Sequence, residues 1–207
     1  LGSDGQGGSD ETIAVPLSAM ELYTSLHDNP ASAPFPFDPT PKGIEVDENK
    51  IYFFCAVGEK EALELIKVLR HLDIEMQYLA LRLAIDPVPI ELHIHSAGGD
   101  IFAGLAVADA IAKCKTPVHT YVEGSVASAA TLMSIVGKKR FISTNGFMLI
   151  HQISSFMVQG KFEEFKDEMQ NQESLMKSIK NIYSQHTKMT TKKMEELLRH
   201  DLWLDGT

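Results

Sequence analysis

Cysteine, tryptophan and positive charge are all scarce in this sequence of 207 residues. It contains two cysteines, one tryptophan, and 19 lysines and arginines against 28 acidic residues, for a net charge of −9. This acidic balance excludes the basic footprint of a nucleic-acid-binding protein, so we predict no nucleic-acid partner. Cys55 and Cys114 lie far apart among apolar residues, so we expect free thiols in a reducing compartment.

Long hydrophobic runs are also missing. No apolar stretch approaches the roughly 20 residues that a membrane-spanning helix needs. The start of the chain has neither the charged region nor the apolar region of a signal peptide. We therefore predict no membrane partner. The 44% hydrophobic content is ordinary for a globular protein, and the length is enough for one sizeable core.

The composition changes along the chain near residue 50. Residues 1–12 are mostly glycine, serine and acid, which bury too little surface to fold alone. Residues 29–43 contain five prolines, which favour an extended segment over a helix. We predict a flexible arm over residues 1–49 and a single folded domain over residues 50–207.

Strand and helix patterns alternate through the predicted domain. Apolar, β-branched runs that predict strands alternate with segments of helical periodicity. We expect the first helix to be interrupted near Asp73, and a turn at Asn145-Gly146 to join the last two strands. Repeated strand–turn–helix units of this kind predict an α/β fold with much parallel pairing. The predicted strands are 51–57, 90–95, 117–124 and two within 140–152, and the predicted helices are 59–84, 101–114, 128–137, 161–187 and 190–200.

Two strand-to-helix turns carry residues suited to chemistry. "SAGG" (96–99) follows one predicted strand and "GSVAS" (124–128) follows the next. A serine at such a turn projects its hydroxyl clear of the backbone, and glycines let another N–H approach it. His151 stands at the polar end of an apolar strand, 23 residues after Ser128 (151 − 128). Taken singly, these features are more often a simple turn, a helix cap or packing residue, and a core or surface histidine, and they gain force only as an ordered set.

Four stretches follow one another along the chain: "HIHSAGGDIFAGLAVADAI", "VEGSVASAATLM", "GKKRFISTNGFMLIHQ" and the Gln159-Gly160 that follows. Their order and spacing resemble the proteolytic subunit of the Clp protease. The resemblance extends over about residues 50–205 and is strongest from His93 to Gly160. It implies an α/β fold of the ClpP/crotonase type, made of repeated strand–turn–helix units with a protruding handle helix and strand.

The same resemblance implies a serine endopeptidase and assigns its residues. Ser128 would be the nucleophile, and His151 would take its proton and later protonate the leaving amine. The remaining assignments are the backbone N–H groups of Gly99 and Ala129 as the oxyanion hole, and Gly98 and Gly160 in the substrate-binding and handle region.

The acidic member of the triad departs from the family pattern. The position that corresponds to the family aspartate is Leu197, which cannot orient an imidazole. We predict that Asp201 replaces it, with Asp205 as a poorer alternative. An ion pair between subunits is the structural alternative for Asp201. Without any such carboxylate, catalysis would be greatly weakened but not necessarily abolished.

The resemblance also implies how the protein works in its surroundings. It predicts peptide and protein substrates, no cofactor or metal for the chemistry, and a heptameric ring or double ring. It further implies an AAA+ unfoldase that would use the ATP, although the proline-rich arm differs from the family's usual N-terminus. The expected location is the cytoplasm, an organelle matrix or the cytoplasm of a phage-infected cell.

Other functions stay open at this point. The chain could be an inactive structural subunit of a mixed ring, a phage-type peptidase that processes capsid or scaffold proteins, or a crotonase-type acyl-CoA enzyme. His93 and His95 share one strand face. We interpret them as a core or interface pair, because no third metal ligand is placed by their spacing.

Overall fold

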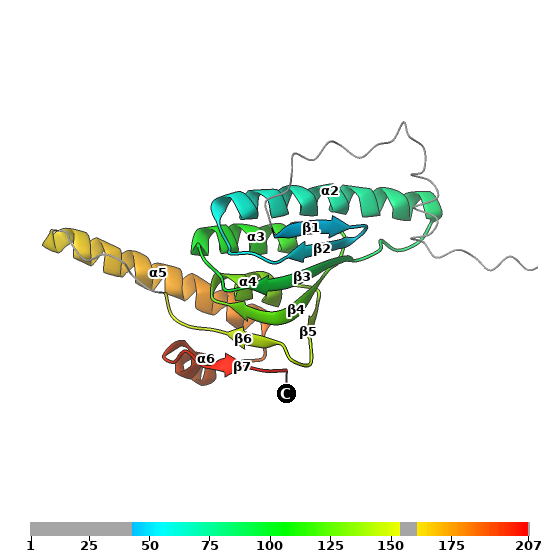
Figure 1. Ribbon diagram of the computed structural model, residues 1–207. Coiled ribbons are helices and arrows are strands. Elements are labelled where there is room, and N and C mark those ends of the chain that lie inside the picture. The colour runs from blue at the N-terminus through cyan, green and yellow to red at the C-terminus, as the bar shows by residue number, and fades with distance from the viewer. Residues whose placement is uncertain (1–42, 154–160, 207) are drawn as a thin grey trace, which may run out of the picture. The chain divides into compact units, whose positions relative to one another are not determined.

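The computed structural model describes residues 43–153 and 161–206, and Figure 1 shows the order of the elements along them. Helices and strands alternate through most of this part of the chain, as the sequence predicts. The strands are β1 (Ile44–Asp47), β2 (Lys50–Phe53), β3 (Ile90–Ser96), β4 (Val118–Ala127), β5 (Lys139–Ile142), β6 (Phe147–Leu149) and β7 (Trp203–Leu204). The helices are α2 (Glu59–Leu83), α3 (Ile101–Lys113), α4 (Ala129–Ile135), α5 (Phe162–His186) and α6 (Thr191–Leu198).

The strands form one mixed sheet in the order β1-β2-β3-β4-β6-β7. β2, β3 and β4 are parallel, while β1 and β7 are antiparallel additions at the two edges. β5 and β6 both pair in parallel with β4, one after the other along its length. The turn at Asn145-Gly146 therefore does not make a hairpin, because its two flanking strands pair with β4 and not with each other.

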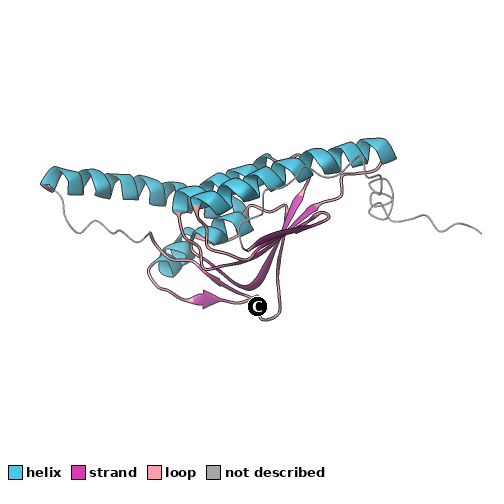
Figure 2. Ribbon diagram, turned by 45° about the horizontal axis from the view of Figure 1, so that its top comes forward, coloured by secondary structure: helices cyan, strands magenta, loops and turns pink. Residues whose placement is uncertain are grey.

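One face of the sheet is covered by helices, which lie together on one side of the strands in Figure 2. The alternation along β3 produces this arrangement. Ile90, Leu92 and Ile94 are completely buried, whereas His93 and His95 lie on the opposite face. The α/β fold predicted from the sequence is confirmed, including its parallel centre.

α2 is continuous over 25 residues, so the interruption predicted near Asp73 is wrong. The Asp73 carboxylate accepts hydrogen bonds from Thr116 N (2.7 Å), Lys115 N (3.2 Å) and Gln77 Nε2 (2.8 Å). Burial alone would raise the pKa of Asp73, but these hydrogen bonds outweigh it and lower the pKa below its ordinary value. Asp73 thus tethers α2 to the loop before β4.

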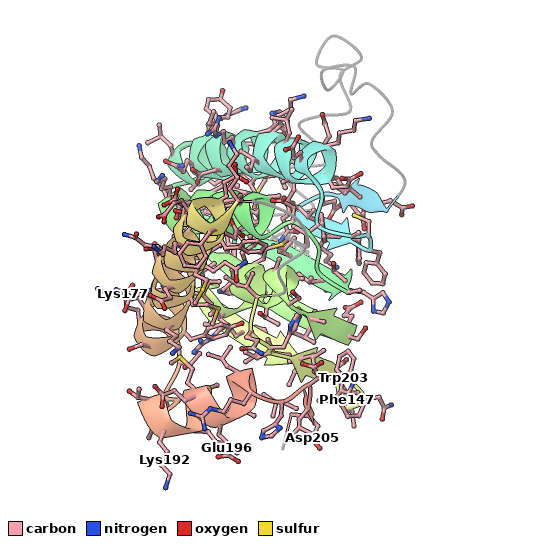
Figure 3. All side chains as sticks on the ribbon, turned by 90° about the vertical axis from the view of Figure 1, so that its left-hand side faces the viewer. Phe147, Lys177, Lys192, Glu196, Trp203 and Asp205 are labelled. Atoms are coloured by element: carbon pink, nitrogen blue, oxygen red, sulfur yellow. The ribbon has the colours of Figure 1, made fainter. Side chains whose placement is uncertain are left out.

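An apolar cluster joins α4 to the last two helices. Ile179 and Tyr183 of α5 pack with Met194 and Leu198 of α6 against α4. The opposite side of α6 is polar, and Figure 3 shows Lys192 and Glu196 pointing away from the body of the protein. This packing brings the end of α5 close to the start of α4.

The limits of the folded part can be compared with the predicted arm and domain. β1 pairs with β2 and lies before residue 50. The boundary between arm and domain stays a prediction, since residues 1–42 lie outside the described part.

Cys55 and Cys114 are both free and half-buried. None of the helices in the described ranges is long and apolar enough to cross a membrane.

The Asp73 tether yields a test of stability against pH. We expect Asp73→Ala to lower the free energy of unfolding by about 1–2 kcal/mol at pH 7, because three donors lose a charged acceptor. A lowered pKa stabilises the fold above the unfolded-state pKa, and this contribution disappears as pH falls through the folded-state pKa. The difference in the free energy of unfolding between wild type and variant should therefore become smaller at acidic pH, as measured by urea unfolding at several pH values.

The matched control is Asp109→Ala on α3, where an exposed carboxylate pairs with the exposed Lys113. This variant should change stability by less than about 0.5 kcal/mol. Equal losses in the two variants would show that Asp73 has no special tethering role.

Candidate active site

Ser128 stands at the junction between β4 and α4. Its backbone has φ 54° and ψ −128°, one of three described non-glycine residues with positive φ. Its N–H donates to Leu149 O of β6 at 2.9 Å. Such a backbone conformation costs free energy and persists only when the surroundings hold it. The strand-to-helix turn predicted from "GSVAS" is therefore a sharp turn with Ser128 at its apex.

The glycine turn after β3 packs directly against Ser128. Gly98 has φ +86°, and a Cβ there would lie 2.5 Å from Ala127 O and 2.7 Å from Ser128 Cβ. Gly99 follows with φ +150° against Val57, whose N–H donates to Gly98 O at 2.9 Å. No larger side chain fits at Gly98, so glycine is what allows the two turns to meet.

His151 reaches the same place from β6. Leu149 pairs with Ala127 at the end of β4, so the chain emerges from the sheet two residues before His151. The His151 ring is half-buried, and the next residue, Gln152, donates its N–H to Leu198 O at 3.2 Å. The parallel pairing of β6 with β4 thereby sets His151 near the β4–α4 junction.

These segments enclose a cavity of about 430 Å³. Ser128, His151, Gly99 and Ala129 all line it, so four of the predicted site residues meet in one space. Most of the other side chains that line this cavity are apolar. The other lining residues are Ala97, Ile101, Leu132, Gln152, Ile153, Ile179 and Tyr183.

The predicted acid does not join this group in the single chain. Asp201 is exposed in the segment between α6 and β7. Within residues 43–153 and 161–206, no hydrogen bond or ion pair links Asp201 to His151. Leu197 is buried in the packing of α6. Asp201 as the third triad member stays a prediction, and Gly160 lies outside the described residues.

Some residues of the cavity were missed by sequence reasoning. Tyr183 is 2% exposed and lines the wall of the cavity from α5. Its hydroxyl is hydrogen-bonded to Thr131 on α4. Tyr183 follows Ile179 by one helical turn, so the helical periodicity of α5 could have found it.

His93 and His95 take part in an aromatic face of the sheet. The His93 ring stacks between Tyr52 and Tyr121, at centroid distances of 4.8 and 4.6 Å, and its Nδ1 lies 2.5 Å from Glu123 Oε1. Among the described residues, no group of three or more His, Cys, Asp and Glu side chains could hold a metal ion. His93 is thus packed among aromatic rings, whereas His95 is exposed, so a core position is wrong for His95 and the interface interpretation stays a prediction.

Comparison with known proteins assigns the family. A family model described as "Clp protease" matches residues 49–207. The chain belongs to the Clp protease family. Two of its relatives are the ATP-dependent Clp protease proteolytic subunit 2 of Treponema pallidum (34% identical over 121 residues) and the corresponding subunit 1 of Chlamydia muridarum (28% identical over 164 residues).

Coverage by these Clp relatives is uneven. The Treponema match covers 58% of this chain and 60% of that protein, and the Chlamydia match covers 78% and 81%. A solved structure of a ClpP1 variant from Listeria monocytogenes superposes with a TM-score of 0.61 at 22% identity, covering 74% of this chain and 80% of that one. The resemblance to the Clp family and its fold, predicted from the motifs, is confirmed.

The contact of Gly98 with Ser128 can be tested in this Clp family member. We expect Gly98→Ala to destabilise the fold by about 1–3 kcal/mol, because the new Cβ would collide with backbone at a strained φ. It should also displace Ser128 from the cavity. Thermal unfolding and covalent labelling of Ser128 measure the two effects.

Gly58→Ala is the matched control. A Cβ at Gly58 would meet only the flexible end of the Glu61 side chain, and its φ is not positive. Gly58 is the N-cap of α2, where alanine is less favoured than glycine, so this variant should cost about 0.5–1 kcal/mol but leave labelling intact. Unchanged labelling in Gly98→Ala would contradict a close fit between the two turns.

Proposed function

We propose that this Clp family chain is a serine endopeptidase that cleaves protein substrates through an acyl-enzyme on Ser128. The observation that carries the proposal is the shared cavity of Ser128, His151 and the backbone of Gly99 and Ala129. An acyl-transfer site needs a nucleophile, a base and donors for the oxyanion within reach of one reacting carbon. The polypeptide supplies all three groups, so no cofactor takes part in the proposed chemistry.

The reaction would proceed in two halves. His151 accepts the Ser128 hydroxyl proton as Oγ attacks the substrate carbonyl, and then gives that proton to the leaving amine. Water subsequently attacks the acyl-enzyme with His151 again as the base. The N–H groups of Gly99 and Ala129 stabilise the negative oxygen in both halves. Each half restores the protonation of the histidine, so Ser128 is regenerated after every cycle.

Asp201 is our candidate for the carboxylate that orients His151. It is exposed in the single chain, on a short segment that leads from α6 into β7. In the proposed assembly, a heptameric ring or double ring, contacts between subunits would bring this segment toward His151. The AAA+ unfoldase of such an assembly would use ATP, and Gly160 would contact the substrate. The proposed location is cytoplasmic.

A second candidate function concerns a chain in which no carboxylate orients His151. Within the described residues, no hydrogen bond or ion pair joins Asp201 to His151, and an inactive structural ring subunit would have the same fold and cavity. A phage-type peptidase that processes capsid or scaffold proteins is instead a variant of the active peptidase proposed above. The two are separated by covalent reactivity at the serine.

A fluorophosphonate probe tests the peptidase proposal directly. We expect one adduct per chain on Ser128 in the assembled protein, detected by intact mass and peptide mapping. Ser128→Ala should abolish the adduct, because the attacking oxygen is removed. Ser125→Ala is the matched control, since Ser125 lies on β4 outside the cavity, and it should label like the wild type. An unlabelled wild-type assembly would favour the structural subunit.

The role of Asp201 has its own test. We expect Asp201→Asn to slow labelling by at least about tenfold, because an unoriented imidazole is a poorer base. Asp205→Asn should label at nearly the wild-type rate. The second-order rate constant of labelling measures both. A large effect at Asp205 with none at Asp201 would move the acid to the alternative position.

A further inference from the structure

A buried chain of hydroxyl groups links α5 to the backbone of Ser128. The Tyr183 hydroxyl is hydrogen-bonded to Thr131 Oγ1 on α4. Thr131 Oγ1 in turn donates to the carbonyl oxygen of Ser128 at 2.5 Å, and Thr131 N–H donates to the same oxygen at 3.0 Å. Tyr183 is 2% exposed and Thr131 is completely buried. The Ser128 carbonyl therefore accepts hydrogen bonds from two donors of Thr131, and the Tyr183 hydroxyl is bonded to one of these donors.

The direction of this chain is determined by proton count. A threonine hydroxyl has one proton, and a carbonyl oxygen can only accept. Because Thr131 gives its proton to Ser128, the Tyr183 O–H must be the donor to Thr131. Burial raises the pKa of Tyr183 to about 12, so the phenol keeps its proton at neutral pH. Each hydroxyl in the chain polarises the next.

The Ser128 carbonyl shares a peptide unit with the Ala129 N–H. This unit is planar and trans, so its C=O and N–H point in opposite directions. Two hydrogen bonds that hold the Ser128 carbonyl therefore also hold the direction of the Ala129 N–H. The rare φ and ψ of Ser128 would otherwise relax toward a commoner conformation and rotate this unit.

We propose that Tyr183, acting through Thr131, is a positioning residue that aims the Ala129 N–H at the developing oxyanion. The inference rests on the proposed function, because it assigns Ala129 to the oxyanion hole. Tyr183 also lines the cavity, so α5 contributes both a wall of the site and the orientation of one of its donors. The link crosses 52 residues of sequence and joins α5 to the serine turn.

A purely structural role is the competing explanation. Phenylalanine and valine would fill nearly the same volumes as Tyr183 and Thr131, without the desolvation cost of two hydroxyls. A packing role therefore needs only the ring and the branched carbon. A positioning role needs the hydroxyls, so the two explanations differ in what Tyr183→Phe and Thr131→Val should do.

The experiment measures the kinetics of fluorophosphonate labelling on the full chain in its assembled form. Ser128 Oγ forms a bond to phosphorus, the P–F bond breaks, fluoride leaves, and His151 takes the hydroxyl proton. The phosphoryl oxygen occupies the oxyanion position, so misdirection of the Ala129 N–H lowers the maximal inactivation rate. We expect Tyr183→Phe and Thr131→Val each to lower it about tenfold, less than the ~10²–10³ of losing a donor outright. The half-saturating probe concentration should not change.

Three further variants make the outcome decisive. Thr131→Ser should keep the wild-type rate because it retains the hydroxyl, and Tyr183→Phe combined with Thr131→Val should be no slower than Thr131→Val alone. Tyr78→Phe is the matched control: the Tyr78 side chain is exposed on α2, and this variant should label normally. Lower thermal stability and a smaller labelled fraction at an unchanged rate would overturn the inference and indicate a packing role. An unlabelled wild type would instead reject the proposed function.

Discussion

The contact between Gly98 and Ser128 is the constraint on which the candidate site depends. Two turns from neighbouring parallel strands meet there without room for a side chain. The register of β3 against β4 shifts between Ile94 and Ser96, which aligns Ser96 with Val126 near the end of β4. Because the strands are parallel, their carboxyl ends share one edge of the sheet, and β6 delivers His151 to the same edge.

Helices complete the wall of the cavity at this edge of the sheet. α5 and α6 pack on α4 through an apolar cluster, and residues of that cluster also form the wall of the cavity. Leu197 of α6 is also buried, at the position that the sequence resemblance assigns to the family aspartate. A carboxylate at that buried position would have to be paired to be tolerated. The chain has instead an apolar residue there and an acid, Asp201, exposed nearby.

The sequence predicted the elements better than their pairing. The periodicity of α2 gave its limits to within one residue, yet Asp73 suggested an interruption that does not exist. Its carboxylate caps backbone donors of a loop more than 40 residues away, a use that local propensity cannot detect. The strands beside Asn145-Gly146 were also predicted, but pairing with β4 depends on the whole sheet, and the turn alone suggested a simpler arrangement.

The sequence by itself determined the family, the α/β fold and the positions of Ser128, His151 and the two glycines. These features are encoded locally, because each lies where a short strand pattern ends at small or polar residues. Only the tertiary structure decided that they share a cavity, and that Tyr183 supports the serine turn through Thr131. It also decided that Asp201 is exposed in the single chain and, within the described residues, forms no hydrogen bond or ion pair with His151. Such relations join residues far apart in sequence, and they arise from packing that no local pattern contains.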